Sequence, residues 1–446
     1  MSPLVWIAHA LAAGGGHGAE EAAHGAHASG DSSMVTVLFL LAVVIGAYML
    51  AHFVVEQLQR TYLLVTGVEY MLLGAFLGPH LVQQVQPFTD MTALGPVFAF
   101  AAGWVGLLYG MELDLRYLLA SADRSIRLAL ADALITGAGT TALALLAFRA
   151  GWLVDGMNDA HVWPAAMLLG CAAGASSSSA VDLIRSRYPD VQTQLLPTLR
   201  RTARLGDLFA IAAFGLVFCV FHEGQTLLSR EPVWSDWVLI SIGLGLLLGL
   251  VFMSFLSEDA GGNDAFLAMI GILLFASGAA FFLHISALLV NLVLGVVVVQ
   301  TAKGLAVRTQ LEATEKPVQL VLLLFAGALW TPVPVLPALG ASVGYIALRV
   351  VSKAVASYVA TVGTPLRGDI FRGLLAQGNV AVAMAVSIKL VYHSEAVDLA
   401  YTAVLFSVAV HEIVAPRLLR GLLVDAGELH QDVLPARVSS SARGGI

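Results

Sequence analysis

Ionisable side chains within long apolar segments are the first candidates for chemistry, because a charge there is costly unless it belongs to a site or has a partner. Nine stand out: Glu69, Asp182, Arg204, Asp207, Arg349, Lys353, Lys389, His411 and Glu412. Asp207, in RRTARLGDLFAIAAFGLVF, is the strongest candidate. A carboxylate that faces a cavity can hold either a proton or a cation. The alternative is a structural Asp207 paired with Arg204, three residues earlier on the same helical face.

Two runs of small and polar residues would interrupt the helices that contain them. The first is Ser176, Ser177, Ser178 and Ser179, just after Gly174, and the second is Gln377, Gly378 and Asn379. An interruption leaves backbone carbonyls and side-chain oxygens free to coordinate an ion at a depth where lipid excludes bare backbone. The alternative is an ordinary helix-packing surface, which small residues also form. Two interruptions at corresponding positions favour a site.

Arg349 and Lys353 are four residues apart in GYIALRVVSKAVASYVA and therefore share one face of a single helix. Two buried cations need anionic partners. We expect Lys353 to pair with Asp207 and to release it when a cation binds; the alternative is a Lys353 that extends to the cytoplasm. We expect Glu69 to pair with Arg349, and the alternative for Glu69 is an ion-binding role.

The remaining acids lie nearer the ends of their segments. Asp182 precedes Arg185, and Glu412 precedes Arg417, so we expect both acids to anchor helix ends or to line the mouth of a cavity. The sequence contains no zinc-ligand spacing, nucleotide-binding loop or nucleophile motif. We therefore expect no cofactor, no metal centre and no enzymatic activity.

Composition indicates where these segments lie. Hydrophobic residues make up 58% of the chain and charged residues 12%, whereas roughly 25% of a soluble globular chain is charged. Apolar runs of about 18 residues or more, long enough to cross a bilayer, recur along the chain, and strand-type alternation is absent. The predicted fold class is therefore an all-α polytopic membrane protein. The net charge of −7 is spread over loops and tails, without the basic cluster typical of nucleic-acid binding.

Hydropathy predicts about 13 transmembrane helices. They lie near residues 34–55, 61–80, 92–113, 127–148, 162–184, 203–222, 236–256, 264–284, 285–302, 317–335, 338–361, 373–392 and 398–416. Lys and Arg concentrate at alternate ends of these helices, which is typical of cytoplasmic loops. We therefore expect a multi-pass protein of the cell inner membrane, with its N-terminus outside and its C-terminus in the cytoplasm.

Weak internal similarity indicates an inverted repeat. The segment at 63–79 corresponds to 283–299, and the segment at 168–184 corresponds to 374–390, with an offset of seven helices that gives the copies opposite orientation. We expect two inverted six-helix repeats, at 34–222 and 263–418, joined by a linker helix at 223–262. A flexible leader rich in Gly, Ala and His, or alternatively a signal peptide, precedes them at 1–33, and a cytoplasmic tail follows at 419–446.

Ordered motifs along the chain resemble those of the monovalent cation:proton antiporter superfamily. In the first half they are GAFLGP (74–79), LLYGMELDL (107–115) and SSSSAVDLIRSRYPD (176–190). In the second half they are ISALLVNLVLGVVV (285–298), LLLFAGALW (322–330), ALRVVSKAV (347–355), LLAQGNVAVAMAV (374–386) and HEIVAPRL (411–418). The similarity covers the transport domain only, without the nucleotide-binding regulatory domain of some potassium-efflux relatives.

The resemblance implies a homodimer in which a core domain, built around two crossed broken helices, moves against a dimerisation domain. By position, Asp207 corresponds to the acidic ion site and Lys353 to its basic partner. Ser176 to Ser179 and Gln377 to Asn379 correspond to the two crossing points. Gly206 stands where many sodium/proton members have a second acid, which favours an electroneutral cycle with a single carboxylate. Arg200, Arg201 and Arg204 depart from a mostly apolar family pattern, and Arg204 is close enough in sequence to neutralise Asp207.

These residues support three functional hypotheses. The first is secondary active exchange of Na⁺ or K⁺ for H⁺ by alternating access to Asp207. The second is a small-anion carrier, coupled to H⁺ or Na⁺, in which Arg204 and Arg349 bind the substrate. The third is a non-transporting membrane sensor or scaffold of the same fold, in which Asp207 and Arg204 form a structural salt bridge.

Overall fold

The computed structural model of the chain describes most of the expected membrane region. The described residues are 67–78, 94–113, 123–152, 159–189, 193–222, 232–255, 262–301, 304–364 and 366–429. The predicted leader (1–33), the first predicted helix (34–55) and the last residues of the predicted tail lie outside them.

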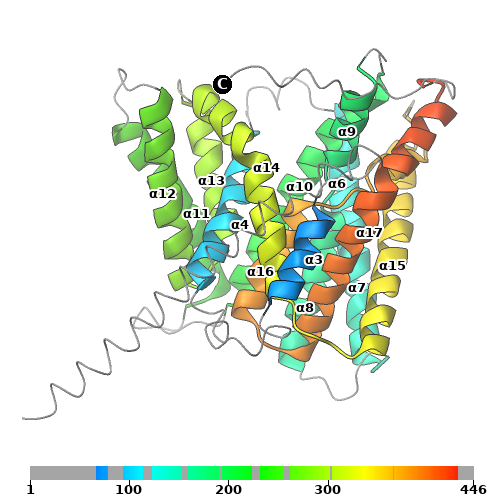
Figure 1. Cartoon of the computed structure of the whole chain (residues 1–446), viewed down its shortest axis with the longest axis horizontal. Coiled ribbons are helices and arrows are strands. Elements are labelled where there is room, and N and C mark those ends of the chain that lie inside the picture. Colours follow the sequence, from blue (N-terminus) through cyan, green and yellow to red (C-terminus); the bar gives the residue numbers. More distant parts are fainter. Residues whose placement is uncertain are drawn as a thin grey trace, which may run out of the picture.

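Helices account for nearly all of the regular structure in these ranges, and no strand occurs among them. In chain order they are α3 (Val68–Leu77), α4 (Gly95–Met111), α6 (Asp123–Ala131), α7 (Gly137–Arg149), α8 (Asp159–Gly174), α9 (Ser179–Arg187), α10 (Leu195–Val220), α11 (Trp234–Phe255), α12 (Gly262–Phe282), α13 (Ala287–Val299), α14 (Gly304–Ala328), α15 (Val335–Thr361), α16 (Asn379–Val391) and α17 (Glu395–Asp425). Most run in roughly one common direction (Figure 1). Seven helical segments within the described ranges are long and apolar enough to cross a membrane, which confirms the all-helical polytopic fold class.

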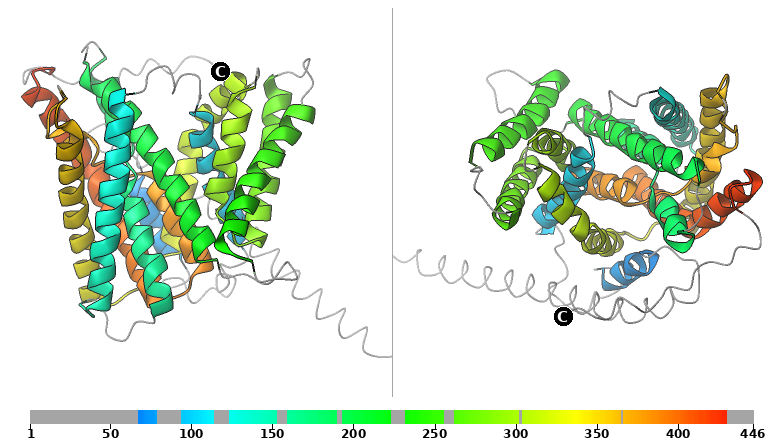
Figure 2. Two further views of the ribbon diagram at one scale, coloured as in Figure 1. Left: turned by 180° about the vertical axis from the view of Figure 1, so that it is seen from behind. Right: turned by 90° about the horizontal axis from the view of Figure 1, so that it is seen from above.

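The helices form two groups. Seen from above, α4 and α11 to α14 lie on one side of the molecule, and α6 to α10, α15 and α17 lie on the other (Figure 2). Helix α3 packs on α14, and α16 contacts helices of both groups, including α4 and α17. The two groups therefore meet along α3, α14, α16 and α17, and also along α10, which contacts α4, α11 and α13.

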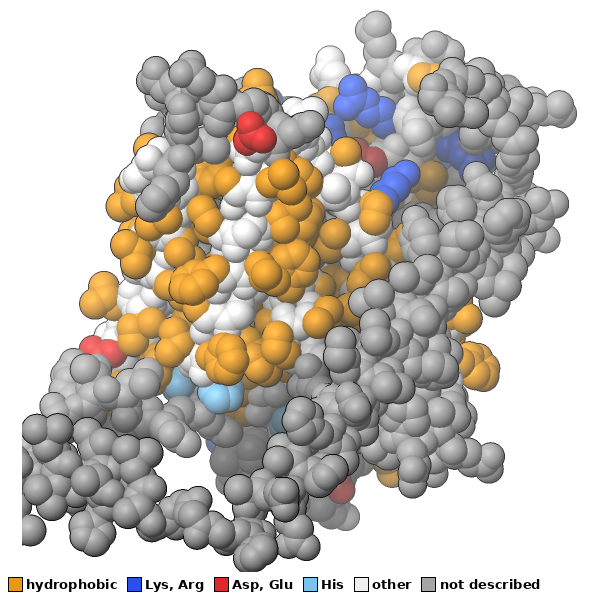
Figure 3. Space-filling model, turned by 60° about the vertical axis from the view of Figure 1, so that its left-hand side comes forward, with side chains coloured by type: hydrophobic (Ala, Val, Ile, Leu, Met, Phe, Trp, Pro, Cys, Tyr) orange, Lys and Arg blue, Asp and Glu red, His pale blue; other side chains and the backbone are white. Residues whose placement is uncertain are grey.

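The outer face of the first group carries exposed apolar side chains. Leu239 on α11 and Phe282 on α12 are 74% and 79% exposed. Hydrophobic side chains cover the middle of this face, and charged side chains lie near its edges (Figure 3). This distribution is typical of a surface in contact with lipid or with another membrane-embedded chain.

Two helices are interrupted, as the polar runs in the sequence predict. The first leaves helical geometry between α8 and α9, at residues 175–178, and the second between a 3₁₀ turn (Ile370–Gly373) and α16. The two interruptions touch, because the Ser177 N–H donates to the Ala376 carbonyl at 2.9 Å. The expected pair of crossed broken helices is therefore present.

Two elements differ from the uninterrupted helices that hydropathy predicts. A π-helical turn, Asp132–Thr136, separates α6 from α7, within the helix predicted at 127–148. Helix α17 continues to Asp425, past the predicted start of the tail at residue 419. The apolar residues Leu419, Leu422 and Leu423 extend its buried face against the core, so the helix does not end with the membrane-spanning segment.

Glycines bring α4 and α13 into close contact. A Cβ atom on Gly106 would lie 2.3 Å from the Leu288 carbonyl oxygen, and one on Gly110 would lie 2.2 Å from the Leu292 carbonyl oxygen. Backbone atoms cannot rotate away as a side chain can, so any larger residue forces the helices apart.

We predict that Gly106→Ala destabilises the protein by about 1–3 kcal/mol, through overpacking of the α4–α13 contact. Thermal unfolding of the detergent-solubilised protein, followed by tryptophan fluorescence, measures the effect as a lower Tm. Gly243→Ala on α11 is the matched control, because a Cβ atom there meets nothing within 4 Å. Equal Tm values for the two variants would contradict the close packing.

Candidate functional site

Asp207 lies inside α10, beside the first interruption, and its side chain is buried. The Ser176 N–H donates to Asp207 Oδ1 at 2.9 Å. The Tyr109 hydroxyl also interacts with this carboxyl group. Oδ2 has no partner of normal hydrogen-bond geometry among the described residues. One carboxylate oxygen is therefore fixed to the broken helix, and the other is buried without a hydrogen bond of normal geometry.

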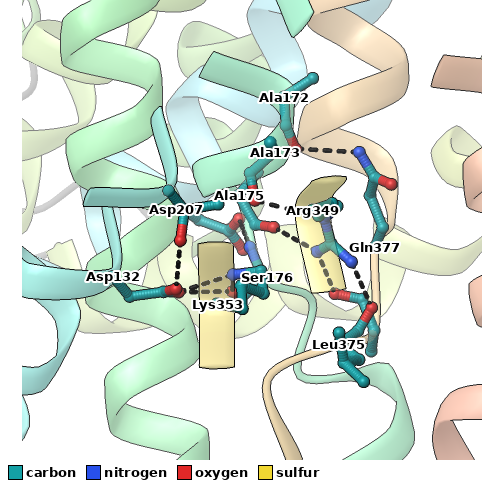
Figure 4. A network of polar contacts seen from close by, with 12 residues as sticks. Asp132, Ala172, Ala173, Ala175, Ser176, Asp207, Arg349, Lys353, Leu375 and Gln377 are labelled. Atoms are coloured by element: carbon teal, nitrogen blue, oxygen red, sulfur yellow. Dashed lines mark hydrogen bonds and ion pairs between the residues drawn. The ribbon is translucent and has the colours of Figure 1, made fainter. Parts of the chain in front are cut away.

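A buried ion pair lies next to Asp207. Lys353 Nζ is 2.6 Å from Asp132 Oδ2, and both side chains are at most 2% exposed. The Thr136 hydroxyl donates to Asp132 Oδ1 at 3.0 Å. Lys353 Nζ donates to Ser176 Oγ at 2.7 Å, and Ser176 Oγ–H donates to Asp132 Oδ2 at 3.2 Å. Ser176 thus connects both carboxylates, Asp132 through its hydroxyl and Asp207 through its N–H (Figure 4).

Asp132 was not among the residues that the sequence singled out. It occupies the first position of the π-helical turn, a feature often found at functional sites. The rule that selects acids inside apolar segments applies to it, because it falls within the predicted helix 127–148. The expectation that Lys353 pairs with Asp207 is wrong in this structure, since the lysine has its ion pair with Asp132.

Arg349 holds the two interruptions together. Its fully buried guanidinium donates to the carbonyls of Ala173, Ala175, Leu375 and Ala376, at 2.7–3.4 Å. These are carbonyl groups of the two chain segments where helical hydrogen bonding stops, and a positive charge at the end of α8 also complements the helix dipole. The expected pair with Glu69 is not formed; Glu69 instead accepts from the Gly67 N–H at the start of α3, at 3.1 Å.

Arg204 makes its contacts with groups other than the Asp207 carboxylate. Its guanidinium forms an ion pair with Glu112, lies over the Tyr109 ring and donates from Nε to Ser178 Oγ at 3.1 Å. No ion pair joins Arg204 to Asp207 in the described part of the chain. The neutralisation that the sequence allowed is therefore not the geometry observed. Glu112, which sequence reasoning missed, is the acid that balances this arginine.

The other predicted residues divide between several roles. Gln377 donates to the Ala172 carbonyl at 2.9 Å and accepts from the Ser407 hydroxyl at 2.7 Å, so it ties the second interruption to α8 and α17. Ser178 donates to Asp182 at 2.9 Å. Ser177, Ser179 and Asn379 face a different set of groups, near Glu412. The structure therefore brings Asp207, Ser176 and Lys353 together and separates them from the rest.

Comparison with known proteins identifies the family of the chain. Residues 49–421 match the family described as "Sodium/hydrogen exchanger, transmembrane". The chain belongs to this family. The exchanger is therefore a multi-pass membrane protein among cation/proton antiporters, which are transporters rather than enzymes.

A solved structure shows the same fold. The exchanger is similar to the sodium proton antiporter MjNhaP1 from Methanocaldococcus jannaschii, with a TM-score of 0.59 and 15% sequence identity. The similarity covers 88% of this chain and 99% of that one. No curated protein matches the sequence of the exchanger closely enough to be compared with it. The resemblance noted in the sequence motifs is confirmed at the level of family and fold.

The buried Asp132–Lys353 pair predicts strongly non-additive mutations. Asp132→Asn leaves an ammonium group without an anion in the interior, and we expect it to cost about 3–5 kcal/mol of unfolding free energy. Adding Lys353→Met should recover most of this loss, because no charge then remains unpaired. Denaturant unfolding in detergent measures both. Glu312→Gln, which breaks the exposed Arg308–Glu312 pair, is the control and should cost less than about 1 kcal/mol. A double variant as unstable as the sum of its singles would contradict the pairing.

Proposed function

We propose that this exchanger carries Na⁺ or K⁺ in exchange for H⁺ at Asp207, by alternating exposure of that side chain to the two sides of the membrane. The observation that supports the proposal most is that Oδ2 of this buried carboxylate has no hydrogen-bond partner of normal geometry among the described residues. A bare charge in such an environment is costly, so the carboxylate favours a proton or a cation as its occupant. Because both occupy the same oxygen, binding of one excludes the other, and that exclusion is the basis of antiport.

The surroundings of Asp207 suit a hard monovalent cation. Such ions take oxygen ligands, including carboxylates, hydroxyls and backbone carbonyls. Asp207 lies beside the interruption at residues 175–178, which places backbone and hydroxyl oxygens at membrane depth. The Ser176 N–H fixes the orientation of the carboxylate by its bond to Oδ1, which leaves Oδ2 for the transported ion.

Lys353 takes a fixed role in this proposal rather than that of a competitor. Its ammonium group is paired with Asp132 and bound to Ser176, so it has no need of Asp207 as a counterion. Asp207 is then the only group of the site that changes its charge state. One cation is exchanged for one proton, and the cycle is electroneutral.

Alternating exposure requires relative movement of the two helix groups. We propose that α6 to α10 with α15 to α17 form the moving core, and that α3, α4 and α11 to α14 form the static part. Asp207 lies in the core, and Tyr109, which interacts with it from α4, belongs to the static part. Glu112, at the end of α4, also belongs to the static part and pairs with Arg204 of the core. The exposed apolar face of α11 and α12 is the proposed homodimer contact. The proposed orientation in the inner membrane places the N-terminus outside and the C-terminus in the cytoplasm.

The geometry supports the other two hypotheses less well. A small-anion carrier needs a guanidinium group free to bind substrate, but Arg349 is occupied by four carbonyls and Arg204 by Glu112. A non-transporting scaffold with a locked Asp207–Arg204 bridge requires an ion pair that the structure does not form between these two residues.

The central test is exchange by Asp207→Asn in proteoliposomes. We expect loss of Na⁺- or K⁺-dependent relaxation of a pH gradient, because an amide cannot trade a proton for a cation. Asp264→Asn, at an exposed acid near the start of α12, is the matched control and should exchange at the wild-type rate.

In the wild type, the apparent KM for the cation should rise as pH falls, because protons compete for the same oxygen. Exchange that persists in Asp207→Asn would overturn the proposal.

Electroneutrality is tested by imposing a membrane potential during Na⁺/H⁺ exchange by the wild type. Moving one net charge across 100 mV is worth about 2.3 kcal/mol, which corresponds to a rate change of up to roughly 50-fold. We expect less than about a twofold change, because the loaded site is neutral in both halves of the cycle. A strong dependence on potential would show that a second group, such as Lys353, changes its charge during transport.

A further inference from the structure

A small cavity lies where the two helix groups meet, between α3, α14, α16 and α17. Its walls include Gly67, Gln319, Leu323, Gly378, Asn379 and Glu412. It has space for about one water molecule or one dehydrated ion. Of the polar groups that line it, Glu412 comes from α17, Asn379 from the start of α16 and Gln319 from α14.

Two buried oxygen atoms of this cavity lack partners. Glu412 is only 4% exposed, and its Oε1 is 3.5 Å from the Ser179 hydroxyl, which is a weak hydrogen bond at best. Glu412 Oε2 and Asn379 Oδ1 have no hydrogen-bond partner in the described part of the chain. Buried polar atoms are satisfied in most native proteins, so two orphans at one cavity indicate an occupant.

The missing side chain of Gly378 keeps the cavity open. A Cβ atom on Gly378 would lie 2.8 Å from Ser177 Oγ and 3.7 Å from Glu412 Oε1. The first contact is tighter than real Cβ atoms show, so any larger residue would intrude between the broken helix and Glu412.

This cavity is distinct from the site around Asp207. Ser176 provides the contacts to Asp207, Asp132 and Lys353, whereas Ser179 contacts Glu412. Ser177 lies between Ser176 and Ser179 in the sequence, and its N–H donates a hydrogen bond to the Ala376 carbonyl.

The groups that face the cavity indicate what it binds. No Lys or Arg is among the described residues that line it, and Glu69 adds negative potential to that of Glu412. The available ligand atoms are carboxylate, amide and hydroxyl oxygens, which hard cations prefer. One carboxylate in direct contact balances one positive charge. We propose that Glu412 and Asn379 Oδ1 form a second monovalent-cation site, at the contact between the two helix groups and independent of Asp207.

The test uses a background in which the first site is removed. Asp207→Asn protein, purified in detergent, is titrated with ²²Na⁺ and with ⁸⁶Rb⁺ as a substitute for K⁺, and bound ion is counted by scintillation proximity. We expect one saturable cation per chain to remain bound. Adding Glu412→Gln should weaken this binding at least tenfold. Adding Glu395→Gln, an exposed acid at the start of the same helix α17, should leave it unchanged.

Folding and the nature of the occupant are checked on the same proteins. Size-exclusion profiles and Tm values identify any variant that fails to fold. Gly378→Ala fills the cavity but keeps the Glu412 charge, so it provides a second way to remove binding. The proposal is overturned if the folded Asp207→Asn protein binds no cation, or if binding survives Glu412→Gln. A Glu412 carboxyl band in the infrared spectrum that does not respond to Na⁺ or Rb⁺ would show that the occupant is only a proton, which also overturns it. Because the readout is binding, the outcome does not depend on whether Asp207 carries transport.

Discussion

The backbone at the crossing of the two interrupted helices needs hydrogen-bond donors in a region where lipid supplies none. Arg349 supplies them, with four hydrogen bonds from one guanidinium group to carbonyls of both chain segments. A lysine would present one compact ammonium group, without the planar set of donors that reaches two segments at once. The proposed ion site at Asp207 is built on this crossing, because the interruption that Arg349 stabilises also supplies the Ser176 N–H.

The position of Arg349 affects the other buried charges. Lys353 lies one turn further along α15 on the same face, and it is equally buried. Its charge requires an acid, and Asp132 on the π-helical turn provides one. Arg204 is balanced separately by Glu112. Of the three acids buried within the described residues, Asp207 and Glu412 are thus left without an ion pair. These two are the residues at which we propose that a mobile positive charge binds.

Much of this arrangement follows from local sequence, and the rest depends on helix phase. Asp207 and the two polar runs could be predicted because a lone acid and a cluster of small polar residues are conspicuous within apolar segments. Asp132 meets the same rule, but its pairing with Lys353 could not be predicted, because the two residues are 221 positions apart and Asp132 lies at a change in helical geometry. A π-helical turn inserts an extra residue and rotates the face that the next helical turns present, so a constant period of 3.6 residues misplaces them. The partners of Arg349 differ from the prediction for another reason. We expected its charge to be balanced by an acid, Glu69, whereas four backbone carbonyl groups accept its hydrogen bonds instead.

In the proposed cycle, coupling of the transported cation and proton depends on the same distribution of charge. The Asp132–Lys353 pair is neutral as a whole, so a moving core carries it through the membrane interior without net charge. With a proton or a cation on Asp207, the site is neutral as well. With neither, a bare carboxylate would have to cross the contact between the helix groups, at a large desolvation cost. The proposed cycle therefore holds back the empty carrier and lets the loaded one move. This condition makes exchange obligatory when both ions bind at one oxygen.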